Sequence, residues 1–345
     1  MPPSLHGDWS PRNRQLLESL LADPGQGGYA VFDWDNTCVY LDVEEATVAF
    51  QVDRLAFAAT PDEMQDALGR GLPSDEDVAQ HLQRLDQAYR WLWPRYNHLL
   101  GRGDYDEVAG SPAHLDFRAR YIALYTLLEH RYGPEIAYPW LPFRFTGMTA
   151  EQVRNVAAQA VRWQLELPIS PVRWESEKLC VTWRGGLRLL PEISSLQRAL
   201  QSVGVDVWVC TASFVEGIRE IASSEEFGYG LPPERVIGLE LETDEQGRYL
   251  PLRKAGSEVT YAQGKSEAVQ RLLESRYGCG PLLVAGDSDG DAPMMSYSKD
   301  TRVGLIIDTD RPADSAIGKL ATLAKQGDPR YLLQRRDDTL GCWQA

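Results

Sequence analysis

The chain has 345 residues, of which 35 are basic and 50 acidic, so its formal net charge is −15 at pH 7. A hydrophobic fraction of 43% is ordinary for globular proteins and excludes a disordered chain. The acidic excess argues against a nucleic-acid or membrane-binding surface, because both need clustered Lys and Arg, but a small anionic substrate stays compatible with a locally positive site.

The amino-terminal half is expected to be mostly helical, with one buried strand. Residues 12–25 have helical spacing, and the short apolar run at 28–33 is typical of a buried strand. From 41 to 185 the pattern is again mostly helical. We expect this stretch to be a helical insertion that follows the first strand and ends near the glycine pair at 185–186.

From residue 186 onward, apolar runs alternate with helical patterns. Such alternation predicts a parallel sheet flanked by helices, because parallel strands are buried on both faces. The expected fold class is therefore α/β, with a Rossmann-like core made of 1–40 and 186–345 and a mainly helical domain at 41–185. The expected elements of the core are helices at 191–204, 214–224 and 265–278, strands at 205–210, 281–287 and 301–309, and two strands joined at a turn within 235–253.

Two carboxylates follow the first strand, in the sequence VFDWDNT at 31–37. In extended backbone Asp33 and Asp35 project to the same side and Trp34 to the other. Ligand and catalytic sites of open parallel sheets lie beyond the carboxyl ends of the strands. A solvated turn and the D-x-D motif of nucleotide-sugar transferases are the alternatives for these residues taken alone.

A second acidic segment, GDSDGD at 286–291, ends another apolar strand. An EF-hand calcium loop would begin at Asp287, but its sixth position is Ala292 rather than Gly and its twelfth is Ser298 rather than Glu. Carboxylates at two strand ends fit Mg²⁺ instead, which binds one or two protein carboxylates together with a substrate phosphate.

Two further segments carry groups that bind anions. Thr211 and Ala212 follow the strand at 205–210 and precede a helix, where donors can hold a phosphoryl oxygen. Lys265, one of only six lysines, stands at a helix start, where it opposes the helix dipole and needs an anionic partner or solvent. The ordinary alternatives are a helix-capping hydroxyl and a solvated lysine.

In this order the four segments resemble the motif set of the haloacid dehalogenase superfamily of phosphohydrolases, in its phosphoserine phosphatase-like branch. The resemblance covers about 26–40 and 186–345. In that family the first Asp is the nucleophile that forms an aspartyl-phosphate, which implies this role for Asp33. The second Asp, here Asp35, protonates the leaving oxygen and then activates water. Its presence favours phosphoryl over carbon–halogen chemistry.

The resemblance also implies a ligand set. Mg²⁺ would be held by the side chains of Asp33 and Asp287 and by the main-chain carbonyl of Asp35. Other residues would bind the phosphoryl group, or would support the metal's waters and orient the lysine. The phosphate-binding residues are Thr211, Ala212 and Lys265, and the supporting residues are Ser288, Asp289 and Asp291.

The helical insertion at 41–185 resembles the cap domain of this branch, which closes over the site and sets substrate choice. Its size, its Trp and Tyr content and the sequence VCTASFVEGIR at 209–219 are most similar to bacterial phosphorylcholine phosphatases. Aromatic faces bind quaternary ammonium groups, although aromatic residues of a helical domain more often form its core. The candidate cage residues are Tyr89, Trp91, Trp93, Tyr96 and Trp140.

We therefore expect a Mg²⁺-dependent phosphomonoesterase that acts on a small phosphorylated metabolite, with phosphorylcholine as the example that the resemblance suggests. The alternatives are phosphoserine hydrolysis, phosphoryl transfer to an alcohol, and a non-catalytic binding or scaffold protein. No nucleic-acid or membrane partner is expected, and the sequence carries no prediction of oligomeric state. The chain has no apolar run of about 18 residues and no secretory pattern at its start, which favours the cytoplasm.

Overall fold

The computed structural model describes residues 4–257 and 259–345, and the chain divides into two compact units. The sequence pattern assigns Leu239–Val259 to the core, whereas the structure groups this segment with the helical unit. The chain therefore passes between the units four times. The first unit comprises Met1–Asp42, Leu187–Gly238 and Thr260–Ala345, and the second comprises Val43–Gly186 and Leu239–Val259.

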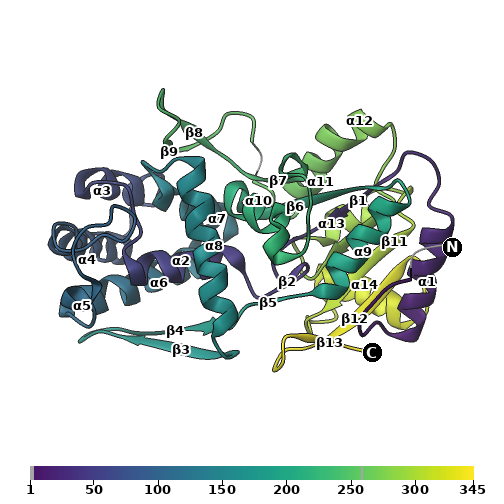
Figure 1. Ribbon diagram of the computed structural model, residues 1–345, viewed down its shortest axis with the longest axis horizontal. Coiled ribbons are helices and arrows are strands. Elements are labelled where there is room, and N and C mark those ends of the chain that lie inside the picture. Colours follow the sequence, from purple (N-terminus) through teal and green to yellow (C-terminus); the bar gives the residue numbers. More distant parts are fainter. Residues whose placement is uncertain (1–3, 258) are drawn as a thin grey trace. The chain divides into compact units, whose positions relative to one another are not determined.

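The first unit is built around a seven-stranded sheet with the order β13-β12-β11-β10-β1-β6-β7 (Figure 1). The strands from β12 to β6 pair in parallel, and β13 runs antiparallel to β12. The predicted Rossmann-like α/β core is confirmed. Its strands are β1 (Tyr29–Phe32), β6 (Asp206–Phe214), β7 (Val236–Leu239), β10 (Leu283–Gly286), β11 (Val303–Asp308), β12 (Tyr331–Asp337) and β13 (Cys342–Gln344).

The central strands are buried on both faces, which explains their continuous apolar sequence. Tyr29 and Val31 of β1 face a cluster that includes side chains of α11, α13 and α14. The alternate residues Ala30 and Phe32 are equally buried, and α1 and α9 pack on β12 and β6 outside that cluster. The helices are α1 (Pro11–Ala22), α9 (Pro191–Ser202), α10 (Val215–Ser223), α11 (Gln263–Val269), α12 (Ser275–Tyr277), α13 (Ala292–Ser296) and α14 (Ala316–Lys325).

The second unit is mainly helical, as expected (Figure 1). Two of its helices begin with a capping box, formed by Thr60 with Glu63 and by Thr149 with Gln152. Among the described residues, no helix combines the length and the apolar composition that a membrane crossing requires. The helices are α2 (Val43–Arg54), α3 (Pro61–Gly69), α4 (Glu76–Leu92), α5 (Tyr105–Val108), α6 (Pro112–Tyr132), α7 (Pro134–Trp140) and α8 (Ala150–Glu166).

Strand pairs complete both units, and several were missed from the sequence. The helical pattern at 41–185 ends in an antiparallel hairpin, and the region 235–253 holds three strands instead of two. The first of the three, β7, joins the large sheet, whereas the other two form a separate hairpin. These strands are β2 (Val39–Tyr40) with β5 (Arg188–Leu189), β3 (Ser170–Glu175) with β4 (Cys180–Gly185), and β8 (Leu241–Thr243) with β9 (Tyr249–Arg253).

Main-chain hydrogen bonds explain why the β8–β9 hairpin belongs to the second unit. The N–H of Gly147 donates to the carbonyl of Tyr249 at 2.8 Å, and the N–H of Tyr249 donates to the carbonyl of Met148 at 2.8 Å. A bridge between Thr149 and Arg248 extends this pairing. The hairpin is therefore paired with the turn that precedes α8.

Gly186 closes the second unit at a position that only glycine fits. Its φ is +97°, and a Cβ there would lie 2.6 Å from the backbone of Ile169.

We expect Gly186→Ala to lower the free energy of unfolding by more than about 2 kcal/mol, because steric overlap adds to the conformational penalty. Gly110→Ala is the matched control, since Gly110 has a φ of +76° with open space around it, and it should cost about 1 kcal/mol. Equal losses in urea unfolding would contradict the steric argument.

Candidate active site

Three parallel strands deliver polar side chains to the same edge of the sheet. Asp33 follows β1, and its N–H donates to the carbonyl of Ala285 in β10 at 2.9 Å, so it continues the ladder by one residue. Asp287 follows β10 directly. The third strand, β6, runs to Phe214, so Thr211 and the two residues after it belong to the strand, whereas the sequence pattern ends the strand at 210.

Three buried carboxylates converge at this edge. Asp33, Asp287 and Asp291 are 6%, 4% and 0% exposed, and one oxygen of each lies within 4.8 Å of the others. Burial and the charge of Asp291 raise the pKa of Asp33 to about 6. Burial and both neighbouring acids raise the pKa of Asp287 to about 8, against the opposing charges of Arg311 and Arg336. The cluster is therefore electrostatically unfavourable unless cations accompany it.

Lys265 supplies one such cation from the first turn of α11. Its Nζ donates to Asp33 Oδ1 at 2.5 Å and to Asp291 Oδ1 at 2.6 Å. Burial alone would lower the pKa of Lys265, but the two carboxylates outweigh burial and raise it. The lysine therefore stays charged, and the structure brings together the residues that the sequence places at 33, 265 and 291.

Asp291 is held in place through its second oxygen. Its Oδ2 accepts the N–H groups of Asp287 and Ser288, at 3.1 and 3.0 Å, and the hydroxyl of Ser288 at 2.9 Å. A Cβ on Gly286 would lie 2.4 Å from Asp291 Cβ, so glycine is needed for this close approach. Asp289 points elsewhere and accepts the N–H of Ile317 at 2.8 Å, at the start of α14.

Hydroxyl groups fix the remaining carboxylate oxygens. Thr37 donates to Asp33 Oδ2 at 3.0 Å, and Ser213 donates to Asp35 Oδ2 at 2.6 Å. The hydroxyl of Thr211 accepts the N–H of Ser213 at 3.1 Å, so the end of β6 is braced beside Asp35. Ala212 lies between these two residues and is half-buried.

The sequence interpretation included Thr37 and Ser213 only as members of their motifs and assigned no role to Arg311, although the structure places all three on site carboxylates. Thr37 and Ser213 stand inside the quoted motifs. Arg311 donates to Asp287 Oδ2 at 3.3 Å and is about half exposed. The sequence could have indicated Arg311, because it closely follows the apolar strand β11. The carboxyl ends of parallel strands lie at the same edge of the sheet, where the site forms.

The chemistry of the donor set fits a divalent cation. Asp33, Asp287 and Asp291 offer hard carboxylate oxygens, and the pKa of Asp287 is raised by burial and by the neighbouring negative charges, which a cation would neutralise. Mg²⁺ binds through one or two carboxylates and retains waters, which suits a cluster whose other oxygens already accept hydrogen bonds.

The five aromatic candidates belong to the second unit and do not form one cage there. Within the described part of the chain, only Tyr89 and Trp93 of the five have rings in contact with each other, with ring centres 5.5 Å apart and planes tilted by 49°. Tyr89 donates its hydroxyl to the Ala59 carbonyl, and Trp140 donates its ring N–H to the Leu68 carbonyl. Both are buried core residues. The remaining two pack on other partners: Trp91 lies against Arg95 and Tyr96 against Tyr105.

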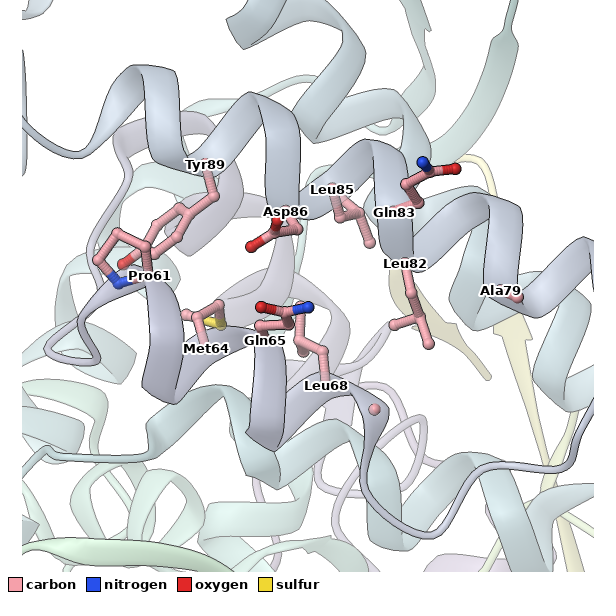
Figure 2. A pocket seen from close by; sticks show the side chains of 11 residues that line it. Pro61, Met64, Gln65, Leu68, Ala79, Leu82, Gln83, Leu85, Asp86 and Tyr89 are labelled. Carbon is pink, nitrogen blue, oxygen red and sulfur yellow. The ribbon is translucent and has the colours of Figure 1, made fainter.

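The same unit has a pocket of about 350 Å³ between α3 and α4 (Figure 2). Side chains of Met64, Leu68 and Leu85 line it, and Tyr89 is its single aromatic residue among those described. Two of its lining residues, Gln65 and Asp86, accept hydrogen bonds from Arg90. This pocket is mainly aliphatic and lacks the several aromatic faces that an ammonium cage needs.

A protein-family model described as haloacid dehalogenase-like hydrolase matches residues 113–296. This is more than half of the chain and includes Thr211, Lys265, Asp287 and Asp291. The chain belongs to the haloacid dehalogenase-like hydrolase family. The prediction of an enzyme of this family is confirmed, and Asp33, which lies outside the matched segment, is joined to it by contact with Lys265.

Comparison with individual proteins agrees with this assignment. The chain is 24% identical over 326 residues to phosphorylcholine phosphatase of Pseudomonas aeruginosa, covering 88% of this chain and 80% of that protein. A solved structure of a functionally unknown protein from Anaerococcus prevotii is 23% identical with a TM-score of 0.88, covering 100% of this chain and 97% of the other. This second likeness shows the shared fold.

The raised pKa of Asp287 makes the metal-free protein sensitive to pH. Because the pKa of Asp287 in the folded protein, about 8, exceeds the ordinary aspartate pKa of 3.8, the folded state holds the proton more tightly, and stability falls as pH rises from about 4 to 8. We expect Asp287→Asn to unfold a few degrees higher than the wild type in EDTA at pH 8, with little difference at pH 5.

Magnesium supplies the second half of this test. At pH 8, Mg²⁺ should raise the melting temperature of the wild type by mass action and leave Asp287→Asn nearly unchanged. Asp289→Asn is the control, because Asp289 contacts α14 instead of the cluster, and it should respond to Mg²⁺ as the wild type does. A stabilised Asp289→Asn, or an Asp287→Asn that still responds to Mg²⁺, would contradict the assignment of Asp287 to a metal site.

Proposed function

We propose that the protein is a Mg²⁺-dependent phosphomonoesterase that works through an aspartyl-phosphate. The observation that carries the proposal is the contact between Asp33 and Lys265 within a buried cluster of acids at the strand ends. Family membership and the 24% identity to a phosphorylcholine phosphatase support the same reaction class.

Asp33 is the proposed nucleophile. One of its carboxylate oxygens attacks phosphorus, and the bond between phosphorus and the ester oxygen breaks, so the phosphoryl group passes to Asp33. Asp35 donates a proton to the departing alkoxide. In the second step Asp35 takes a proton from water, whose oxygen attacks phosphorus and releases inorganic phosphate from Asp33. The two steps return both carboxyl groups to their starting states.

Asp35 suits the role of acid and base because its surroundings differ from those of Asp33. Asp33 is 6% exposed and contacts Lys265, whereas Asp35 is partly exposed and accepts a hydrogen bond from Ser213. Two carboxyl groups in unlike environments acquire unlike proton affinities, which separates a nucleophile from a proton carrier. Thr37 orients Asp33 through its Oδ2.

Phosphate binding is assigned to Thr211, Ala212 and Lys265. The hydroxyl of Thr211 and the N–H of Ala212 offer donors at the end of β6, and Lys265 offers its ammonium group. Charge accumulates on the phosphoryl oxygens in the transition state, so fixed donors at this point lower the barrier. When substrate binds, the ammonium group of Lys265 would donate a hydrogen bond to a phosphoryl oxygen in place of the one that it donates to Asp33.

The metal would be held by the side chains of Asp33 and Asp287 and by the main-chain carbonyl of Asp35. When bound, Mg²⁺ supplies positive charge that offsets the repulsion between the carboxylates and the phosphate. Asp291 supports this arrangement by fixing Lys265 and the N–H groups after β10, with Ser288 as its hydroxyl partner. Asp289 is assigned to the support of α14.

The proposed substrate is a small soluble phosphate ester similar to phosphorylcholine, with the second unit acting as the cap that selects it. The relative from Pseudomonas aeruginosa supports this choice. The proposal does not depend on the five aromatic candidates as a set, because Tyr89 and Trp140 are committed to the core of that unit.

Asp33→Asn tests the mechanism. An amide is a poor nucleophile, so turnover of an aryl phosphate with Mg²⁺ should fall by at least about 10³-fold, while the melting temperature changes little. Asp289→Asn makes the same chemical change two residues after Asp287 and should keep activity close to wild type. Substantial turnover by Asp33→Asn would refute the assigned nucleophile.

A panel of phosphomonoesters tests the substrate class. We expect phosphorylcholine to give a higher kcat/KM than phosphoserine, with Mg²⁺ present. Adding glycerol or another alcohol should release inorganic phosphate without a phosphorylated alcohol, which separates hydrolysis from phosphoryl transfer. A preference for phosphoserine would reverse the substrate proposal, and no hydrolysis of any ester would favour a binding protein.

A further inference from the structure

The loop at 36–41, directly after Asp35, carries backbone strain. Asn36 has a φ of 59° and Leu41 a φ of 68°, in the left-handed region that side chains disfavour. The loop closes on itself, because the N–H of Asn36 donates to the Leu41 carbonyl at 3.0 Å and the N–H of Leu41 donates to Asn36 Oδ1 at 3.2 Å. Three further amides of the loop donate to the carbonyl of Trp34. A strained loop of this kind keeps its shape only where its surroundings hold it.

Arg336 of β12 reaches this loop from the other end of the sequence. Its Nη1 donates to the Asn36 carbonyl at 2.7 Å, and its Nη2 donates to Asn36 Oδ1 at 3.4 Å. The guanidinium carbon lies 4.6 Å from the centre of the Tyr40 ring, and Nε pairs with Asp338 at 2.8 Å. The Arg336 side chain is 2% exposed, so it is committed to these contacts.

The turn between β12 and β13 holds the same loop at a second point. The hydroxyl of Tyr40 donates to the main-chain carbonyl of Asp338 at 2.6 Å. Arg336 and Asp338 are thus joined to each other and to opposite ends of the loop, at Asn36 and Tyr40. The carboxyl-terminal hairpin braces the loop as a unit.

The contact at Asn36 is transmitted to the carboxylates by covalent geometry. The Asn36 carbonyl and the Thr37 N–H belong to one planar peptide group. Thr37 carries the hydroxyl that donates to Asp33 Oδ2, and Asp35 precedes Asn36 in the chain. A shift of this peptide group therefore moves Thr37 and Asp35 relative to Asp33.

We propose that Arg336 is a positioning residue for the reaction at Asp33. By holding the Asn36 carbonyl, it keeps Asp35 and Thr37 aligned with the nucleophile. The inference rests on the proposed function, because this alignment matters only if Asp35 exchanges protons during turnover. Arg336 lies outside the segment that the family model matches, and no family motif points to it.

Three variants test the inference in the full chain: Arg336→Met, Arg336→Lys and the control Arg335→Met. Arg335 is the neighbouring arginine of the same strand and is exposed. For each variant we would measure kcat and KM with an aryl phosphate and Mg²⁺, the melting temperature, and hydrogen–deuterium exchange of a peptide that covers 34–41.

Arg336→Met should lower kcat by about 10- to 100-fold, the cost of misplacing reacting groups by about 1 Å, with KM near the wild-type value. Amides of 36–41 should exchange faster, because Arg336 no longer holds the loop. Arg336→Lys should recover part of kcat, since an ammonium group can still donate to the Asn36 carbonyl. Arg335→Met should behave as the wild type in all three measurements.

The results separate this inference from the proposed function. A wild-type protein that hydrolyses no phosphate ester overturns the proposed function. An active wild type with normal kcat and normal loop exchange in Arg336→Met overturns the positioning role alone. If Arg336→Met does not fold, Arg336→Lys decides: a lowered kcat with faster loop exchange supports the role, and wild-type values in both overturn it.

Discussion

The site depends on one buried positive charge among buried acids. Lys265 lies between Asp33 and Asp291, within hydrogen-bonding distance of both. Burying an ion costs several kcal/mol unless its partners compensate, so neither the lysine nor the acids would be stable at this depth alone. The net charge of −15 is therefore no guide to the site, because the local balance is set by a lysine, two arginines and, in the proposed enzyme, a metal ion.

Parallel strand pairing determines which residues this lysine can meet. Val31 of β1 pairs with Val284 of β10 and Trp208 of β6, so segments remote in sequence end side by side. Each strand is buried on both faces, which leaves its carboxyl end as the place where polar groups can gather. The acids, the hydroxyls and the lysine need no common sequence neighbourhood, because the sheet supplies their proximity.

Local sequence patterns predicted the core, the acids and Lys265, but they did not indicate Arg336. Asp33, Lys265 and Asp287 stand beside recognisable strands or helix starts, so their positions follow from sequence. Arg336 gives no such signal, because its contact with Asn36 joins residues that are 300 positions apart and exists only once the sheet has formed.

The β8–β9 hairpin was assigned to the core because its sequence alternates as in any strand. Only its hydrogen bonds with the turn at Gly147 show that it belongs to the second unit. The five aromatic candidates stay a prediction, and helical spacing alone does not distinguish a ligand-facing ring from a core ring such as Tyr89 or Trp140.

The division of the first unit into three chain segments has a consequence for biosynthesis. During translation the amino-terminal region emerges first, and β1 has no sheet partner until β6 and β10 follow. Val43–Gly186 is continuous and rich in local helical contacts, which form quickly. All of Val43–Gly186 is therefore synthesised before β6 and β10, the strands that pair with β1, and Leu239–Val259 follows between those two strands. Arg336 and the strand that carries it are synthesised after β1, β6, β10 and β11, so the loop beside Asp35 is secured only after these strands have been made.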